Sequence, residues 1–317
     1  MDIGLMVEGQ AGLTWERWNH IVSMADRLGF SSLYRTDHLY VNSQLESLDA
    51  FLSFAVAANI SNRIRLGPLC TSFSLRSPVS MGRMAAQLDQ LSEARFTLGL
   101  GVSWYEPEFK TYGLPFPSIK ERYDRLEEGI ELIRNLWSPG PSTFKGRFYT
   151  LEGADCLPKP IANRLPIIIG GTGERRTLRA VAQYADEWNC DGYHNPDMYA
   201  HKLSVLERHC EDVGRDIATI RRSMLAHVIT GPDQAAIDRV KPHAMKLMGA
   251  PEWSSRDNVQ DAESEGTLIG NAEQIVERLA QLANLGVQEV ELQHYDFASD
   301  EVPEYIAAEI MPLVQTL

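Results

Sequence analysis

The chain has 317 residues, 44% of them apolar and 23% charged, so it is long enough to bury a large core. Its formal net charge of −13 repels nucleic-acid backbones and argues against a general nucleic-acid-binding protein. The four cysteines include no CxxC pair, so they predict no metal site. Together with an N-terminus that does not resemble a signal peptide, they favour a cytoplasmic location. No apolar run is long enough to predict a membrane span.

Apolar runs that predict strands alternate with amphipathic stretches that predict helices along most of the chain. The predicted strands are Ile3–Val7, Ser32–Arg35, Ile64–Cys70, Phe96–Leu100, Pro166–Ile169, Glu187–Cys190, Ile220–Val228 and Val287–Gln293. The predicted helices span residues 14–28, 48–59, 77–91, 119–136, 175–184, 196–213, 233–248, 271–285 and 304–317. Strands that alternate with helices imply a parallel sheet, and eight such units favour a closed (β/α)8 TIM barrel over an open sheet.

Two stretches interrupt this alternation. Residues 138–165 are rich in Pro and Gly around two short β-like pieces, and residues 250–266 are polar. We interpret both as inserted loops, because the alternation resumes after each of them. The sequence therefore predicts one domain over residues 1–317.

The active site of such a barrel is built at the C-terminal ends of its strands. One strand runs into the glycines Gly170, Gly171 and Gly173, with Thr172 between them and Arg176 close behind, directly before a helix. Glycines allow close backbone approach, and a helix N-terminus offers free N–H groups to an anion. The run therefore predicts a phosphate-binding loop, although a plain strand–helix turn would have a similar sequence.

A second strand ends in Asp37 and His38. Histidine is the side chain most easily poised for proton transfer near neutral pH, so this pair is the candidate catalytic group; a polar loop end is the alternative. His227 and His294 also lie at strand ends and are weaker candidates. Trp104 could stack on a planar cofactor, although aromatic residues at strand ends more often serve packing.

Several stretches between residues 24 and 189 together resemble the luciferase-like monooxygenase superfamily, and most of all its F420-dependent oxidoreductases. They include ADRLGFSSLYRTDHLY, RIRLGPLCTSFSLRSPVSMGRMAAQLDQLSEARFTLGLGVSW and PIIIGGTGERRTLRAVAQYADEWN, in the order found in that family. Each motif is loose by itself, and their order carries the resemblance.

The resemblance implies a flavin or deazaflavin ring at the mouth of the barrel and a homodimer. Asp37 and His38 would lie beside the ring, with His38 as the catalytic base, and Gly170 to Gly173 with Arg176 would hold the cofactor phosphate. Two other sets of residues would form walls of the ring site: Thr71 and Ser72, where the family often has a non-prolyl cis peptide, and Gly101, Val102 and Trp104.

One departure concerns the acid that some dehydrogenases of this family carry directly after the strand-four Gly-x-Gly. Here that position is Val102, and Glu8 or Glu106 are the alternative acids. The favoured function is hydride transfer between coenzyme F420 and a small organic substrate that the sequence does not identify. The alternatives are an FMN-dependent monooxygenase that uses reduced flavin and O2, and a flavin-binding relative without turnover.

Overall fold

A computed structural model describes residues 1–41, 47–161, 164–190, 196–247, 267–294 and 298–317. The predicted insertion at residues 250–266 lies outside this described part. Within that part, no helix is long and apolar enough to cross a membrane. All four cysteines are described, and no disulfide joins them.

Eight parallel strands form a closed ring in which each strand pairs with the next along the ring and the last pairs with the first. They are β1 (Asp2–Val7), β2 (Ser32–Asp37), β3 (Arg65–Ser72), β4 (Leu98–Gly101), β7 (Ile167–Gly170), β8 (Glu187–Cys190), β9 (Arg221–Thr230) and β11 (Glu289–His294). These are the eight strands that the sequence predicts, so the TIM barrel is confirmed.

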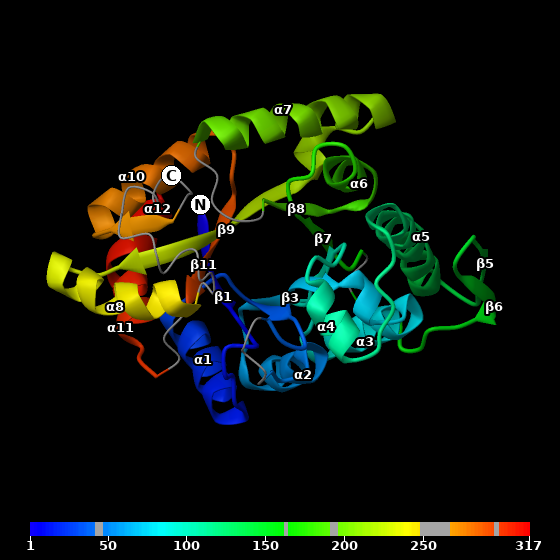
Figure 1. Cartoon of the computed structure of the whole chain (residues 1–317), viewed down its shortest axis with the longest axis horizontal. Coiled ribbons are helices and arrows are strands. Elements are labelled where there is room, and N and C mark those ends of the chain that lie inside the picture. Colours follow the sequence, from blue (N-terminus) through cyan, green and yellow to red (C-terminus); the bar gives the residue numbers. More distant parts are fainter. Residues whose placement is uncertain (42–46, 162–163, 191–195, 248–266, 295–297) are drawn as a thin grey trace.

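Helices surround the strands in Figure 1, and each begins close to the residue that the sequence predicts. They are α1 (Trp15–Leu28), α2 (Ala50–Ile60), α3 (Pro78–Leu91), α5 (Ile119–Trp137), α6 (Thr177–Tyr184), α7 (Pro196–Val213), α8 (Gln234–Leu247), α10 (Ala272–Asn284), α11 (Glu301–Tyr305) and α12 (Met311–Val314), with a π-helical segment (Ile306–Ile310) between the last two. Capping explains the boundaries of α1: the Thr14 hydroxyl accepts the Arg17 N–H, and Gly29 ends the helix at φ +93°.

Some elements lie outside this alternation. The antiparallel hairpin of β5 (Ser142–Lys145) and β6 (Thr150–Ala154) projects beyond α5 at one end of the molecule (Figure 1). Strand β10 (Leu268–Gly270) pairs with the C-terminal end of β9. Helix α4 (Glu106–Thr111) follows β4. Short 3-10 turns occupy Phe73–Leu75 and Ile217–Thr219.

The interior of the barrel is divided into an apolar side and a polar side. Met6, Tyr34, Leu69 and Ile168 pack together on strands β1, β2, β3 and β7. The opposite side, on β8, β9 and β11, consists of polar side chains: Glu187, Asn189, Ser223, Glu289 and Glu291. TIM-barrel interiors are usually filled by branched apolar residues, so this polar half is unusual.

Two arginines at the opposite end of the barrel from the predicted site balance most of this buried charge. Arg65 and Arg221 both pair with Glu187 and Glu289. Glu291 lies deeper and accepts a hydrogen bond from Asn189 Nδ2 at 2.9 Å. Burial, together with the nearby charge of Glu187, raises the pKa of Glu291 well above its usual range.

Candidate functional site

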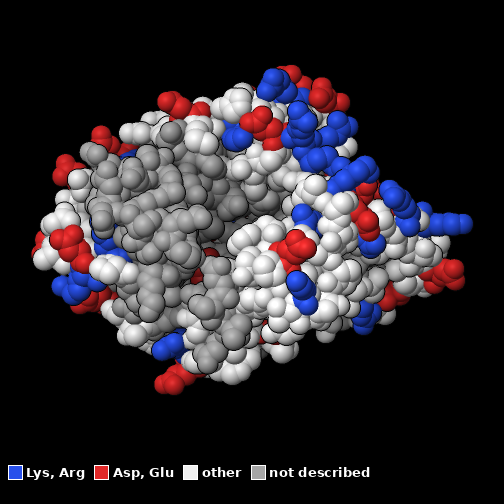
Figure 2. Space-filling model, in the orientation of Figure 1, with Lys and Arg blue, Asp and Glu red and all other residues white. Residues whose placement is uncertain are grey.

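The register of the sheet gathers most of the predicted site residues into one row at the C-terminal end of the barrel. Asp37 is level with Thr71, Thr71 with Leu100, and Leu100 with Ile169. The next row up therefore contains Ser72, Gly101 and Gly170 on three adjacent strands, and His38 follows directly after the end of β2. Figure 2 shows a hollow near the centre of this view of the molecule, where Figure 1 places the barrel strands.

The floor of this row is made of two glycines packed around Cys70. A Cβ atom added at Gly170 would lie 2.7 Å from Cys70 Sγ, and one added at Gly101 would lie 3.4 Å from Cys70 Cβ. Beside them, the Ser72 hydroxyl is buried and has no hydrogen-bond partner among the described residues. A buried, unsatisfied hydroxyl could hydrogen-bond to a polar edge of a bound molecule.

A non-prolyl cis peptide is present in β3, but not where it was predicted. It joins Leu69 to Cys70, and the peptide bonds from Cys70 to Phe73 are trans, so the prediction at Thr71–Ser72 or its immediate neighbours is wrong in position. The reason is a bulge: between the Arg35–Pro68 and Asp37–Thr71 pairs, β2 has one residue and β3 has two. The sequence pattern does not reveal which strand carries the extra residue.

His38 is held by a residue that the sequence analysis missed. Its Nδ1 lies 3.0 Å from Oε1 of Glu108 in α4, and the other oxygen of Glu108 accepts the Leu39 N–H at 2.9 Å. Burial alone would lower the pKa of His38, but the hydrogen bond and charge of Glu108, with the charges of Glu8 and Asp37, raise it above its usual value. The alternative acid Glu106 is exposed at the start of the same helix.

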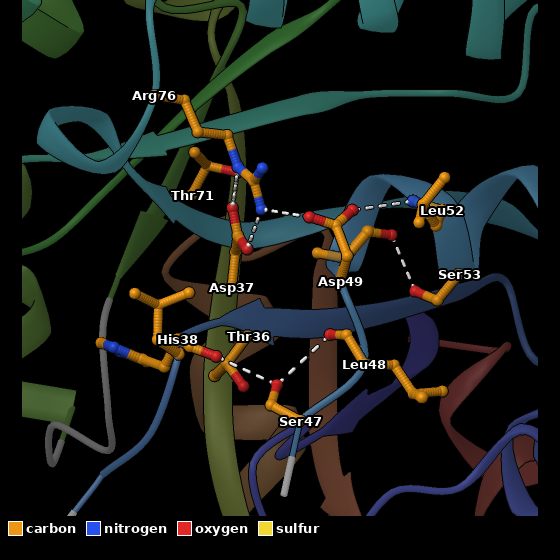
Figure 3. Close-up of polar contacts among 12 residues, drawn as sticks. Thr36, Asp37, His38, Ser47, Leu48, Asp49, Leu52, Ser53, Thr71 and Arg76 are labelled. Carbon is orange, nitrogen blue, oxygen red and sulfur yellow. Dashed lines mark hydrogen bonds and ion pairs between the residues drawn. The ribbon is translucent and has the colours of Figure 1, made fainter. Parts of the chain in front are cut away.

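Asp37 points the other way, as Figure 3 shows. Both of its oxygens accept hydrogen bonds from Arg76, at 3.0 and 2.8 Å, and Thr71 donates to it at 3.1 Å. Arg76 also pairs with Asp49. Burial alone would lower the pKa of Arg76, but the two carboxylates outweigh this effect and raise it. Asp37 therefore orients β3 and the segment after it, and does not contact the His38 ring.

The glycine loop has the backbone geometry expected of a close-approach segment. Gly171 has φ +118°, which favours glycine, and a Cβ at Gly173 would lie 2.6 Å from the Thr177 hydroxyl. That hydroxyl is itself 2.6 Å from the Tyr123 hydroxyl of α5. The loop is thus fitted tightly against the first turn of α6, where the Leu178 N–H donates to the Gly173 carbonyl at 3.0 Å.

Arg176 does not join the loop in the way the sequence predicts. Its guanidinium bonds to Asp124 and Glu127 of α5, at 2.9 and 2.7 Å, and lies over the Tyr123 ring. These two carboxylates outweigh the effect of burial and raise the pKa of Arg176. The arginine therefore links α6 to α5.

The opposite side of the mouth is lined by a polar network on β1, β9 and β11. Glu8 accepts hydrogen bonds from the side-chain amides of Gln10, at 2.5 Å, and Gln293. Gln293 also bonds to His227, whose pKa burial lowers to about 4. His227 is therefore neutral at pH 7, whereas His38 is the more basic histidine at this end.

Trp104 is 67% exposed and lies edge-on to the His38 ring, with 5.6 Å between the ring centroids. Val102 packs against the main core and carries no ionisable group. The mouth thus combines a glycine floor, a histidine whose pKa is raised and an exposed aromatic ring. A model of the luciferase-like monooxygenase family matches residues 3–289.

The chain belongs to the luciferase-like monooxygenase family.

Members and structural neighbours of this family show the range of its chemistry. Pyrimidine monooxygenase RutA of Escherichia coli O150:H5 (strain SE15) is 27% identical over 293 residues, which cover 85% of this chain and 75% of RutA. An F420-dependent secondary alcohol dehydrogenase, in complex with an F420–acetone adduct, superposes with a TM-score of 0.84 at 20% identity, over 99% of this chain and 98% of that one. A type II Baeyer–Villiger monooxygenase of Pseudomonas putida, in complex with FMN, superposes with a TM-score of 0.73 at 17% identity, over 98% of both chains. Members of the luciferase-like family are oxidoreductases and monooxygenases, and this chain is an enzyme of that kind.

Proposed function

We propose that the chain is an F420-dependent oxidoreductase that moves a hydride between the deazaflavin and a small organic substrate, as one domain over residues 1–317. The observation that carries this proposal is the arrangement of His38 after the end of β2 beside the row of Ser72, Gly101 and Gly170, which sets a histidine of raised pKa beside the glycine floor. Val102 carries no ionisable group, which favours His38 as the proton-transfer group.

The residues divide into two groups around such a cofactor. Its ring would lie along Thr71, Ser72, Gly101, Val102 and Trp104, and its phosphate would lie against Gly170, Gly171, Thr172 and Gly173. The Gly171 N–H already donates to the Asn189 carbonyl, so Thr172 and Gly173 are the candidate N–H donors. Arg176 would contribute at longer range, because Asp124 and Glu127 already occupy its guanidinium. When bound, the deazaflavin supplies the hydride chemistry. The protein orients the substrate, excludes water from the floor and moves a proton at His38.

Titration of the purified protein with F420, FMN and FAD tests this proposal. We expect F420 to bind more tightly than FMN, and the loaded enzyme to reduce or oxidise substrates without oxygen uptake. FMN binding that equals or exceeds F420 binding would overturn the cofactor assignment. Binding without turnover on a panel of alcohols, ketones and enones would favour a non-catalytic relative.

The second candidate is an FMN-dependent monooxygenase, and the similarity to a pyrimidine monooxygenase favours it. In that case oxygen uptake should accompany turnover when reduced FMN is supplied. His38 and its carboxylate partner would then hydrogen-bond to the reacting groups at the mouth rather than accept a proton from an alcohol. Measurement of oxygen uptake separates the two candidates directly.

A homodimer is part of the proposal, and helix α2 supports it. The eleven residues of α2 include no charged side chain, although Leu52 is 62% and Ile60 38% exposed. An uncharged, partly exposed helix is unusual on a molecule with a net charge of −13 and fits a surface covered by a second copy. Sedimentation velocity should report a dimer, which Leu52→Glu dissociates.

A cytoplasmic location remains proposed from the cysteine pattern.

A further inference from the structure

The segment that follows β4 closes over the end of β2. Trp104 packs against His38, Tyr105 packs against Tyr40, and the Tyr40 and Thr111 hydroxyls lie 2.8 Å apart. Glu108 lies in the middle of these contacts and bonds to both His38 and Leu39. Residues 104–111 therefore form a small clamp on residues 38–40, and this clamp fixes the position of the imidazole.

Glu108 is the unusual member of the clamp, because its carboxylate is fully buried. A buried carboxylate is costly unless it is hydrogen-bonded or paired with a cation. Among the described residues, its hydrogen-bond partners are the His38 ring and the Leu39 N–H, and no lysine or arginine pairs with it. His38 is thus the group that can balance its charge.

The geometry also determines which nitrogen of His38 faces the mouth. Nδ1 is directed at a carboxylate oxygen, which accepts but does not donate when ionised. Nε2 has no hydrogen-bond partner in the described part of the chain and is not among its fully buried unpaired polar atoms, so a bound molecule can reach it.

We infer that Glu108 is a positioning residue that holds the His38 proton on Nδ1 and presents Nε2 as the proton acceptor at the mouth of the barrel. In water an imidazole can carry its proton on either ring nitrogen. The carboxylate of Glu108 therefore selects the tautomer of His38 and increases the basicity of its ring. The catalytic consequence rests on the proposed oxidoreductase function. When an alcohol is oxidised, its carbon gives a hydride to the deazaflavin and its hydroxyl proton goes to Nε2.

Two other carboxylates near His38 also raise its pKa, but each of them has partners of its own. Glu8, directly after β1, is held by two amides, and Asp37 on β2 is paired with Arg76. Glu108 on α4 is the carboxylate in direct contact with the ring, so it should contribute most of the rise in the pKa of His38. Removing its charge while keeping its shape should therefore lower the pKa of His38 towards the value that burial alone would give.

Nitrogen-15 NMR of the wild-type protein without cofactor tests the tautomer directly. The His38 signals are assigned by their loss in His38→Asn. Above the pKa of His38, we expect Nδ1 to be protonated and Nε2 unprotonated. A neutral His38 with its proton on Nε2 would overturn the inference, and this measurement requires neither activity nor a mutant of Glu108.

Glu108→Gln then tests the charge, with Glu106→Gln on the exposed side of the same helix as the matched control. We expect the pKa of His38 to fall in Glu108→Gln and to stay unchanged in Glu106→Gln. In turnover, the acidic limb of the pH profile should move to lower pH, and the maximal rate should fall about tenfold or more. An unchanged pKa of His38 in a folded Glu108→Gln protein would contradict the positioning role. Failure of F420 to bind, with the NMR result as expected, would reject the proposed cofactor and leave this inference standing.

Discussion

The His38 imidazole is the residue whose removal should affect the chemistry most while sparing the cofactor site. General acid–base groups contribute about 10²–10⁴-fold to rate, so His38→Ala should lower single-turnover rates by that order. The floor of Ser72, Gly101 and Gly170 does not depend on the imidazole, so the cofactor dissociation constant should change by only a few-fold. Both quantities are measured on the same variant.

Asp37→Asn is the natural comparison, because Asp37 is adjacent in sequence but bonds to Arg76. Removing one partner of a buried ion pair costs about 3 kcal/mol or more of folding free energy, so this variant should lose stability in chemical denaturation.

An intact rate in His38→Ala would remove His38 from the mechanism. Weaker binding with an intact rate would make it a wall of the ring pocket.

These two residues also show how far the sequence could predict the site. Strand ends predicted which residues gather at the mouth, because parallel strands place their C-terminal ends together. The pattern could not predict that Asp37 and His38 face different partners. It also could not choose Glu108 over Glu106, since residues two apart on a helix point roughly 200° apart and only tertiary packing decides which one is buried.

At the scale of elements, the glycine loop before α6 is the segment most sensitive to added side-chain volume. A valine at Gly173 would displace the Thr177 hydroxyl and break its contact with Tyr123. We expect Gly173→Val to weaken cofactor binding at least tenfold, or about 1.4 kcal/mol, because the loop N–H groups could no longer approach a phosphate. Equilibrium binding measures this change, and a thermal melt confirms folding. An unchanged affinity in a folded variant would place the phosphate elsewhere.

The same scale shows which elements the sequence predicted and which it did not. The long periodic helices and all eight barrel strands were predicted, because their apolar spacing is imposed by a core on one or both sides. Strand β10 has only three residues and α4 only six, which is too short for a period to appear. Both depend on neighbours from elsewhere in the chain, β9 for the former and residues 38–40 for the latter.

At the scale of the whole molecule, the polar half of the barrel should make stability depend on pH. Because the folded pKa of Glu291 is raised above its unfolded value near 4.5, its contribution to stability is complete below that value and is lost as pH rises through the folded pKa. Glu291→Gln should preserve the contact with Asn189 and remove this loss. Chemical denaturation at pH 5 and pH 9 measures the difference.

The expected result is a smaller decrease in unfolding free energy between the two pH values in Glu291→Gln than in the wild type. Glu277→Gln, on the exposed side of α10, is the matched control and should behave like the wild type. An identical pH dependence in Glu291→Gln and the wild type would show that Glu291 is ionised in the folded protein.

The pairing of β1 with β11 also has a consequence for folding during translation. β1 is synthesised well before its partner β11, which is complete only when His294 has been added. At about 5–20 residues per second, the interval between the two strands is on the order of 15–60 s. The ring cannot close before β11 is present, so any sheet that the earlier strands form in this interval keeps unpaired edges, which can pair with other chains. The rate of translation therefore sets how long these edges stay unpaired, whatever the stability of the finished ring.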